Sequence, residues 1–439
     1  AELYEALFAR SGIISVSNPS QFLETLKLLC VVGAPSGRRL AGFTCSGGGA
    51  TMLADYAEKI GLSFLPVDPA QEEDLAALLP KIATVSNPLD YTTPIWGQAD
   101  LTYPVFSKAV DAIEADSAVL VQDYPAAGLD SSKIYYQRDA VAFARATKEK
   151  GLPAAICATL PENMDLETRQ LLISEGVAPM QGIHETLNAI CTSAAWSQER
   201  VRLLSEKLKP LLPALHKCEC VMATEDEGKK WLIANGFFVP EGSVVSASGV
   251  RKAADEVGYP VVLKMIGPLL AHKTEAGAIA LSLNDAEMVN AAVAQMKLDV
   301  VAFNPNAITN QFLVEAMSPT PVAELIVTLR RDPQFGMALV LGSGGVLVEL
   351  VADTTTLLLP TSTVEITRAL LGLRVGRLLE GFRGGATVDI HKIAAQIYQM
   401  CIAYIENCHA IVEIEINPLF VYSEKICAVD ALVHMAAEG

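Results

Sequence analysis

Strand-like and helix-like segments alternate along the first half of the chain, and this alternation restricts the fold more than any other feature. Short apolar runs at 38–45 and 117–122 are typical of buried strands, whereas 50–60 and 138–150 have the spacing of helices. Strands that alternate with helices form a parallel sheet with helices on both faces. The pattern predicts an α/β fold with a flavodoxin-like parallel-sheet domain over residues 20–212.

The chain has 439 residues, which is too long for one ordinary hydrophobic core. A polar amphipathic helix is expected at 197–212 and is interrupted from Pro210 on, where we place the domain boundary. Thr224 then begins a capping box that opens the next helix. We expect a linker helix over 1–19 and, after the flavodoxin-like domain, an α+β domain over 213–439.

The composition excludes some classes of function. Hydrophobic residues make up 51% of the chain and charged residues 19%, which is typical of well-buried globular domains. The formal net charge is −17, whereas a nucleic-acid-binding protein needs a basic surface for the phosphates. We therefore expect no nucleic-acid partner, and an anionic membrane surface is disfavoured for the same reason. An anionic ligand has to be held locally, by helix N-termini, lysines and arginines.

The nine cysteines are scattered, and Cys218 and Cys220 lack the second pair or the histidines of a zinc site. We interpret the cysteines as buried thiols in a reducing cytosol. No apolar stretch reaches the roughly 18 residues of a membrane span, and the start of the chain lacks the features of a signal peptide. These features predict a cytoplasmic protein with no membrane partner.

A glycine run follows the first predicted strand. Gly47, Gly48 and Gly49 stand between this strand and a helix, where unpaired N–H groups and the positive helix end can hold a phosphate. A tight turn is the alternative, and the spacing is not that of a dinucleotide-binding fingerprint. We favour phosphate contact over a simple turn.

Asn417 and Asp430 form a second candidate site near the other end of the chain. Each follows an apolar strand, and Pro418 with residues 423–425 supplies the turn chemistry between the strands. Magnesium usually takes only one or two oxygen ligands from protein, and phosphate and water supply the rest. A carboxamide and a carboxylate on neighbouring strands meet that need, and the alternative is that Asn417 and Pro418 only form a turn.

Several motifs precede this pair in a fixed order. They are Val261–Lys264, Ala271–Ala278, Phe312–Met317, Arg330–Gly336 and Leu341–Val346. In this order and spacing, the segment from about 222 to 437 resembles the ATP-grasp half of the ADP-forming acyl-CoA synthetases, relatives of succinyl-CoA synthetase.

The first half of the chain resembles the small ligase domain of the same family. Asn87-Pro88-Leu89-Asp90 is similar to a motif of that domain, usually Asn-Pro-Val-Asp. The run Gly47–Gly49 resembles its glycine-rich turn, which faces a phosphorylated histidine. The resemblance therefore extends over both predicted domains.

The resemblance assigns the most specific role to His272. It identifies His272 as the histidine that relays phosphate beside the nucleotide, and a neutral imidazole is available as a nucleophile near neutral pH. Family members usually show His-Lys-Ser-Asp here, whereas this chain has Thr274 and Glu275 after Lys273, which keep the functional groups. The alternative is a loop histidine with no role.

The resemblance also implies nucleotide-binding roles. Lys264 looks like the lysine on the phosphates of the nucleotide, although a strand-end lysine is most often only solvated. Glu315 resembles the acidic residue that contacts the adenosine part, and Gly344 and Gly345 resemble the loop that passes over the phosphates. Arg330 is expected to stabilise the transferring phosphoryl charge, unless it only pairs with a nearby carboxylate or with solvent.

The reaction that the resemblance implies is that of an acid–thiol ligase. A carboxylic acid, coenzyme A and ATP give acyl-CoA, ADP and phosphate through an acyl phosphate and phosphohistidines, with magnesium on the nucleotide. A complete member also has a CoA-binding domain and a first phosphohistidine ahead of a stretch similar to residues 3–14. We therefore expect CoA to bind mainly to a missing N-terminal segment or companion subunit, in a homo- or hetero-oligomer. Residues 1–439 alone are expected to bind ADP or ATP but to form no acyl-CoA.

Three other classes of function stay open at this point. One is a binding module, the synthetase-like regulatory region of a protein acetyltransferase. An ATP-grasp carboxylate–amine ligase would share Lys264, Asn417 and the glycine loop, but it has no use for His272. A regulatory or non-catalytic nucleotide-binding subunit of a synthetase-like protein would keep the fold without the reaction. The sequence does not identify the carboxylic acid.

Overall fold

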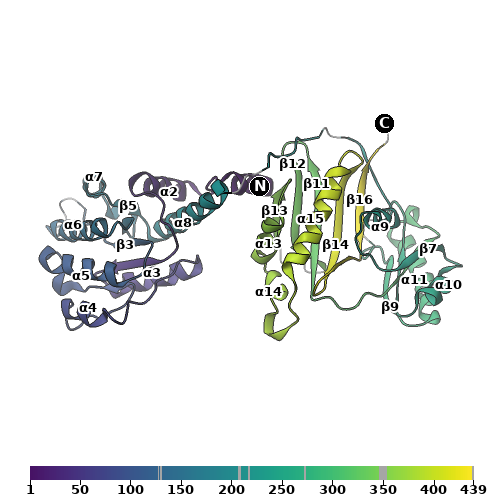
Figure 1. Ribbon diagram of the computed structural model, residues 1–439, viewed down its shortest axis with the longest axis horizontal. Helices are drawn as coiled ribbons and strands as arrows, with labels where there is room; N and C mark the ends of the chain where they lie inside the picture. The colour runs from purple at the N-terminus through teal and green to yellow at the C-terminus, as the bar shows by residue number, and fades with distance from the viewer. Residues whose placement is uncertain are drawn as a thin grey trace. The chain divides into compact units, whose positions relative to one another are not determined.

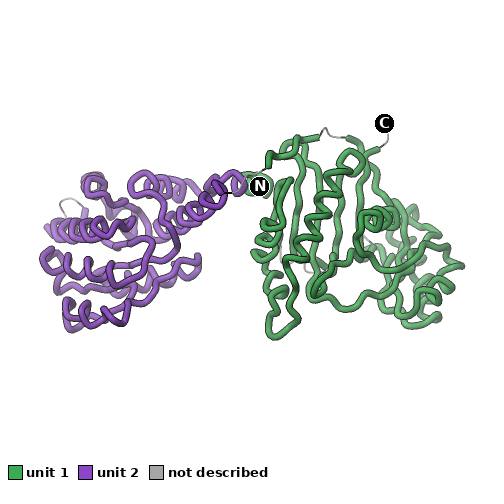
Figure 2. The backbone as a smooth tube through the Cα atoms, viewed as in Figure 1, with its two compact units in different colours: residues 1–7, 209–439 green, residues 8–208 purple. Residues whose placement is uncertain are grey.

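The computed structural model describes residues 1–126, 128, 131–205, 209–215, 218–270, 273–345 and 353–437. Its internal contacts divide the chain into two compact units (Figure 2). The N-terminal unit consists of residues 8–208, and the C-terminal unit consists of residues 1–7 and 209–439. Residues 1–7, which the sequence analysis places in a linker over 1–19, thus belong to the C-terminal unit.

The N-terminal unit is built on a five-stranded sheet in which all neighbouring strands are parallel. Its strands are β1 Leu40–Thr44, β2 Leu89–Asp90, β3 Ser117–Val121, β4 Ala154–Ala158 and β5 Ala178–Gln181. Their order in the sheet is β2-β1-β3-β4-β5, which is the flavodoxin order. The prediction of an α/β, flavodoxin-like fold for this part of the chain is confirmed.

Helices cover both faces of this sheet (Figure 1). They are α2 Pro19–Val31, α3 Gly47–Lys59, α4 Glu72–Leu78, α5 Ala99–Ala112, α6 Lys133–Lys150, α7 Leu166–Glu175 and α8 Ile183–Ser205, with 3-10 turns η1 Thr93–Ile95 and η2 Pro161–Asn163. Successive strand residues point to opposite faces. Val119 therefore shares a buried cluster with residues of α2, α3 and α8, whereas the next residue, Leu120, shares one with residues of α4 to α7.

Two predicted helix boundaries in this unit are wrong. The helix expected from residue 50 begins at Gly47, so the glycines form its first turn and do not precede it. The separate helix expected at 197–212 is the last part of α8, which runs without interruption to Ser205, and residues 209–215 form no helix. The buried side of α8 lies in its first half, so its polar second half resembles an independent surface helix in the sequence.

The C-terminal unit contains two antiparallel sheets. The smaller sheet has the order β7-β10-β8-β9. Its strands are β7 Gly242–Ser246, β8 Val261–Met265, β9 Ile279–Leu283 and β10 Gln311–Ala316, and the helices around it are α10 Val250–Val257 and α11 Ala286–Phe303, followed by the turn η3 Pro305–Ala307. Buried residues of α10 and α11 form one core with the inner face of this sheet.

The larger sheet has seven strands in the order β13-β12-β11-β14-β16-β6, with β15 paired to β14. Its strands are β6 Cys220–Met222, β11 Ala323–Asp332, β12 Gly336–Ser343, β13 Thr354–Leu358, β14 Ile411–Val421, β15 Ile426–Ala428 and β16 Ala431–Ala436. The accompanying helices are α9 Glu225–Ala234, α13 Thr363–Gly372, α14 Gly376–Leu379 and α15 Ile390–Glu406, with the turn η5 Phe382–Gly384. The predicted α+β organisation of this part is confirmed.

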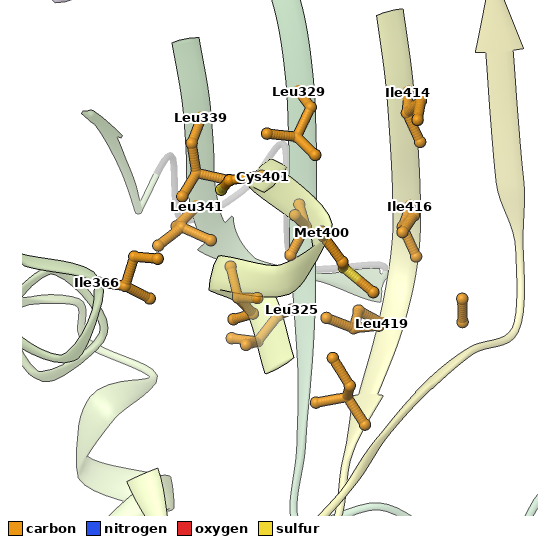
Figure 3. Packing of buried hydrophobic residues seen from close by; sticks show 14 of the residues in the cluster. Leu325, Leu329, Leu339, Leu341, Ile366, Met400, Cys401, Ile414, Ile416 and Leu419 are labelled. Atoms are coloured by element: carbon orange, nitrogen blue, oxygen red, sulfur yellow. The ribbon is translucent and has the colours of Figure 1, made fainter. Parts of the chain in front are cut away.

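The core of the C-terminal unit lies between the larger sheet and α15. Figure 3 shows Met400 and Cys401 of α15 beside Leu329, Leu339 and Ile416, which come from β11, β12 and β14. The buried positions of α15 recur every three or four residues, which is the spacing of one helix face. This packing fixes β14, the strand that carries the candidate metal ligand Asn417.

The first helix, α1 Glu2–Ser11, adds a small apolar contact to the C-terminal unit. Ala6 packs with Ala338 and Leu358, and the rings of Tyr4 and Phe335 meet edge to face with centroids 4.8 Å apart. These contacts explain why residues 1–7 belong to this unit.

All nine cysteines are free. Cys157, Cys401 and Cys408 are buried, whereas Cys30, Cys218 and Cys220 are exposed. The prediction of buried thiols is therefore wrong for these exposed cysteines. Within the described residues, no helix combines the length and the apolar character needed to cross a membrane.

Candidate active site

Five buried charged residues meet where α9, the smaller sheet and the segment between β15 and β16 come together. They are Glu225 and Lys229 on α9, Lys264 on β8, Lys273 after β8, and Glu315 on β10, and we call them the lysine cluster. Each of these side chains is at most 8% exposed. Charged groups are this deeply buried only when they are paired.

Lys229 and Lys264 bind the same set of acceptors. Lys229 Nζ lies 2.7 Å from Glu225 Oε1, 2.5 Å from Glu315 Oε1 and 2.9 Å from the Val429 carbonyl oxygen. Lys264 Nζ lies 2.5 Å from Glu225 Oε1, 3.1 Å from Glu315 Oε2 and 2.7 Å from the same carbonyl. Each lysine thus has three acceptor atoms close to its Nζ. Two of these contacts are hydrogen bonds, to Glu315 and the Val429 carbonyl for Lys229 and to Glu225 and the same carbonyl for Lys264, and the third is an ion pair.

Lys273 has a different set of partners. Its Nζ lies 3.1 Å from Glu225 Oε2 and 3.1 Å from Asp430 Oδ1. Asp430 is more exposed than the cluster, at 29% of its side chain. Lys273 therefore connects the buried Glu225 to the carboxylate of Asp430, which lies at the accessible edge of the lysine cluster.

The charges in the cluster stabilise one another. Burial acts to raise the pKa of the Glu225 carboxyl, but the charges of Lys264, Lys229 and Lys273 outweigh this and hold that pKa well below its usual range. Burial acts to lower the pKa of Lys264, but Glu225 and Glu315 outweigh it and raise that pKa above its ordinary value. The pKa of Lys273 is raised by Glu225 and Asp430 against the same opposing effect of burial. Glu225, Lys264 and Lys273 are therefore charged at neutral pH.

Local structure explains how the sequence brings these groups together. In the β8–β10 register, Lys264 is opposite Leu313 and Glu315 is opposite Val262, so Lys264 and Glu315 are diagonal neighbours on one face. On α9, Glu225 and Lys229 are four residues apart and share a helix face. The predicted capping box at Thr224 is confirmed and begins this helix directly before Glu225.

Part of this site was not predicted from the sequence. The sequence analysis predicts Lys264 at the phosphates and Glu315 at the adenosine part, whereas the structure pairs the two side chains, with Lys264 buried inside β8 and not at a solvated strand end. The adenosine role of Glu315 stays a prediction. Glu225, Lys229 and Lys273 were missed as site residues. The only local signal was the spacing of Glu225 and Lys229, which is also common on solvated helices.

The expected metal pair lies beside this cluster. Ile416 of β14 is opposite Ala431 of β16, and Asn417 and Asp430 each adjoin this pair, so the register places them next to one another. The expected turn at Pro418 is wrong, because β14 continues through it to Val421. The pairing with β11 shifts at this point, which is a β-bulge, and bulges tolerate proline and redirect neighbouring side chains.

The oxygen atoms of this pair suit magnesium. Asn417 Oδ1 accepts a hydrogen bond of 3.0 Å from the N–H of Gly345 and keeps a second lone pair, and Asp430 contacts only the Lys273 ammonium among the ion pairs of the described residues. Within the same residues, no group of three or more His, Cys, Asp or Glu side chains forms a metal site. Two hard oxygens fit a magnesium ion that takes its other ligands from phosphate and water.

The glycine pair after β12 is fixed against β11. A Cβ atom on Gly344 would lie 2.4 Å from the backbone carbon of Leu325, and Gly345 has a positive φ of 68° and adjoins the Glu324 carboxylate. Only glycine fits both positions. Through Gly345 the loop contacts Asn417, so the structure brings the predicted glycine pair to the predicted metal pair.

The glycines of the N-terminal unit occupy the first turn of α3. Gly47 and Gly48 are exposed, and Ser46, the residue before the helix, makes no capping side-chain hydrogen bond. This turn stands at the carboxyl end of β1, which neighbours both β2 and β3 and is a common position for ligands in such sheets. The Asp90 carboxylate lies 3.6 Å from the Cβ position of Gly47 and adds a negative charge there.

The structure does not join Arg330 to the lysine cluster. Arg330 is opposite Glu413 in the β11–β14 register, four residues along β14 from Asn417, which corresponds to about 13 Å of strand. His272 lies outside the described residues. Their roles stay predictions.

Comparisons with known proteins identify the family of this chain. The family model of an ATP-grasp domain matches residues 217–435. The beta subunit of an ADP-forming acetate–CoA ligase I from Pyrococcus furiosus is 32% identical over 216 residues, which cover 49% of this chain and 92% of that subunit. The chain belongs to the ADP-forming acyl-CoA synthetase family.

Other members of the synthetase family match both units. A trans-feruloyl-CoA synthase from an unknown prokaryotic organism is 27% identical over 98% of this chain and 60% of its own length. The ADP-forming acetate–CoA ligase I of Archaeoglobus fulgidus is 27% identical over 98% of this chain and 61% of its own length. The chain thus spans about 60% of the length of these synthetases.

A solved structure of the synthetase family is also similar. It is a dinucleotide-forming acetyl-coenzyme A synthetase 1 from Ca. Korarchaeum cryptofilum in complex with coenzyme A and Ca-AMPCP. It is 32% identical, covers 49% of this chain and 93% of that chain, and has a TM-score of 0.46.

Proposed function

We propose that this chain supplies the nucleotide-binding and phosphoryl-transfer part of an enzyme that converts a carboxylic acid, CoA and ATP into acyl-CoA, ADP and phosphate. The observation that carries the proposal is the buried lysine cluster beside Asn417, Asp430 and the Gly344–Gly345 pair. Buried ammonium groups next to two magnesium-type oxygens suit a nucleotide polyphosphate. The family relationship supports the same reaction.

Each group has a defined task in this proposal. Asn417 and Asp430 would hold magnesium, which would offset the negative charge of the nucleotide phosphates. Lys273 is the lysine of the cluster that pairs with Asp430, a carboxylate that is 29% exposed, so it is the first lysine to meet a phosphate. Lys264 reaches a phosphate only by giving up one of its three acceptors.

The phosphoryl acceptor in the proposal is His272. The residue that follows it, Lys273, lies in the site, and phosphate on an imidazole nitrogen would be stabilised by nearby ammonium groups. γ-labelled ATP should give acid-labile, base-stable label that is absent in His272→Asn. Undiminished label in a folded His272→Asn protein would remove His272 from the mechanism.

The acyl and CoA chemistry is assigned to a partner region. We propose that CoA binds mainly outside residues 1–439, on the same polypeptide or on a companion subunit, and that the first turn of α3 at Gly47–Gly49 contacts phosphate. Relatives named as beta and alpha subunits of acetate–CoA ligases support a companion chain. The nine free cysteines fit a reducing compartment, and we place the enzyme in the cytoplasm.

The test measures thioester formation and nucleotide binding separately. Residues 1–439 are assayed with magnesium, ATP, CoA and a panel of short and aromatic acids, with and without a CoA-binding partner from a related enzyme. The proposal expects Mg·ADP binding in both cases and acyl-CoA only with the partner. Absence of nucleotide binding would overturn it, and steady thioester formation by residues 1–439 alone would overturn the assignment of CoA to a partner region. The curated relatives described above are CoA ligases and synthases, so a carboxylate–amine ligase is not favoured.

A further inference from the structure

Glu225 contacts every lysine of the lysine cluster. Its Oε1 lies 2.7 Å from Lys229 Nζ and 2.5 Å from Lys264 Nζ, and its Oε2 lies 3.1 Å from Lys273 Nζ. Glu315, the other buried carboxylate, contacts Lys229 and Lys264 but has no ion pair with Lys273 among the described residues. Glu225 is thus the one described side chain that joins Lys264 to Lys273.

The two lysines that Glu225 joins come from different segments. Lys264 lies within β8, whereas Lys273 lies in the turn segment between β8 and β9, outside both strands. A lysine side chain is a compact charge on a flexible four-carbon stem, so it needs a fixed acceptor to hold one position. Asp430, the other acceptor of Lys273, is one of the proposed magnesium ligands.

Among the described residues, Lys229 forms no ion pair with the more exposed Asp430, in contrast to Lys273. It is 5% exposed, donates hydrogen bonds to Glu315 and the Val429 carbonyl, and forms an ion pair with Glu225. Lys264 also contacts both Glu225 and Glu315, whereas Lys273 contacts Glu225 but not Glu315 among the described residues. The evident effect of Lys229 is to balance the negative charge of the carboxylates that hold the other lysines.

We propose that Glu225 is a positioning residue that holds Lys264 and Lys273 side by side for the nucleotide phosphates, with Lys229 as its balancing charge. This inference rests on the proposed function and adds a residue that does not touch the phosphates itself. Fixed donors stabilise developing charge better than mobile ones, because they need no rearrangement during the reaction. When Asp430 binds magnesium, Glu225 is the carboxylate that remains to hold Lys273.

The test separates position from charge balance. Glu225→Gln adds one positive charge to the net charge of the cluster, and the double variant Glu225→Gln with Lys229→Met restores the net charge of the wild type. The carboxamide in Glu225→Gln still offers one oxygen to a lysine, but its N–H₂ group cannot accept a hydrogen bond from a second lysine. Asp226→Asn is the matched control, since Asp226 is on the same helix and pairs with the exposed Lys230.

Two measurements are made on the wild type, the control and both Glu225 variants. The first is the calorimetric affinity for Mg·ADP, where we expect the double variant to recover thermal stability but to bind about tenfold more weakly, because Lys273 loses its ion pair with Glu225. The second is the rate at which an amine-reactive reagent modifies Lys273, followed by mass spectrometry. We expect this rate to rise several-fold in the double variant, whereas Lys230, 71% exposed, stays unchanged as an internal standard.

The outcomes distinguish this inference from the proposed function. If the double variant binds Mg·ADP as the wild type does and Lys273 reacts at the wild-type rate, Glu225 serves only charge balance and the inference is wrong. If the wild type does not bind Mg·ADP, the proposed function fails, while the reactivity of Lys273 still decides whether Glu225 positions it. Glu225→Asp keeps the negative charge but shortens the side chain. Relative to Glu225→Gln, it should recover more of the stability than of the Mg·ADP affinity, and equal recovery of both would also contradict a positioning role.

Discussion

The two units of this protein each bury a carboxylate, and they stabilise it by opposite means. In the N-terminal unit, Asp139 is fully buried and accepts hydrogen bonds from the Tyr91 hydroxyl, the Thr102 hydroxyl and the Gly97 N–H, all of them neutral donors. In the C-terminal unit, Glu225 is also buried but is surrounded by ammonium groups.

The difference appears in the pKa of each group. Burial raises the pKa of Asp139 above its ordinary value, and its neutral donors only reduce this rise. Burial acts in the same direction on Glu225, but the three lysines reverse it and the pKa of Glu225 is lowered. Neutral donors thus accommodate a carboxylate within a core, whereas lysines make the same group part of a site that can hold an anion. The following experiments test this contrast.

The largest expected effect is on stability. Glu225→Ala leaves buried lysines without their shared carboxylate, and breaking a buried ion pair costs about 3–5 kcal/mol. Urea denaturation measures this loss. The exposed pair of Asp226 with Lys230 serves as the control, since removing an exposed pair costs about 0–1 kcal/mol. Equal stability of Glu225→Ala and Asp226→Asn would show that the buried lysines do not depend on Glu225, which would contradict the contrast drawn above.

The next effect is on ligand binding at the edge of the lysine cluster. Asp430→Ala and Asn417→Ala should each weaken Mg·ADP binding by at least about tenfold, as loss of groups in a metal site does. The fold should remain intact, because Asp430 is partly exposed and lies at a strand end. Calorimetry with and without magnesium measures the change. Unchanged affinity in both variants would reduce the pair to a structural role.

A smaller effect concerns the dependence of stability on pH, where the two carboxylates should act with opposite signs. Asp139 has a raised folded-state pKa, so it lowers stability as pH rises from the ordinary value of 3.8. Glu225 has a lowered folded-state pKa, so its contribution is present above the ordinary value of 4.5 and is lost as pH falls below it.

Urea denaturation across acidic pH, compared between the wild type and Asp139→Asn or Glu225→Gln, measures both contributions. The stability difference between wild type and variant should fall with rising pH for Asp139 and rise with pH for Glu225. If the stability difference changes with pH in the same direction for both residues, the lysines do not reverse the effect of burial on the pKa of Glu225.

The last prediction concerns two glycines of α3, and the smallest effect is expected at Gly47. A Cβ atom on Gly49 would lie 2.6 Å from Thr44 Oγ1, whereas on Gly47 the nearest side-chain atom is 3.6 Å away. Gly49→Ala should therefore cost about 1–3 kcal/mol, and Gly47→Ala should change stability by about 1 kcal/mol or less. Thermal denaturation measures both. A large loss of stability in Gly47→Ala would show that the backbone conformation at this position requires glycine, although there is room for a side chain.

Much of the fold could be predicted because its signals are local. The alternation of strands and helices predicted the parallel sheet of the N-terminal unit, and the capping box at Thr224 predicted the start of α9. The closeness of Asn417 and Asp430 also followed from two neighbouring strands separated by a hairpin. The turn expected at Pro418 failed because a β-bulge accommodates proline inside a strand, and a bulge depends on the partner strand.

By itself, the sequence determined which chemical groups are present and which local elements carry them. Only the tertiary structure decided that Glu225 meets Lys264, 39 residues away, and that Lys273 meets Asp430, 157 residues away. An acidic residue four positions before a lysine has the same pattern on a solvated helix and in a buried site. Burial is a property of the whole fold, and it is burial that makes these charges depend on one another and gives the proposed site its suitability for a phosphate.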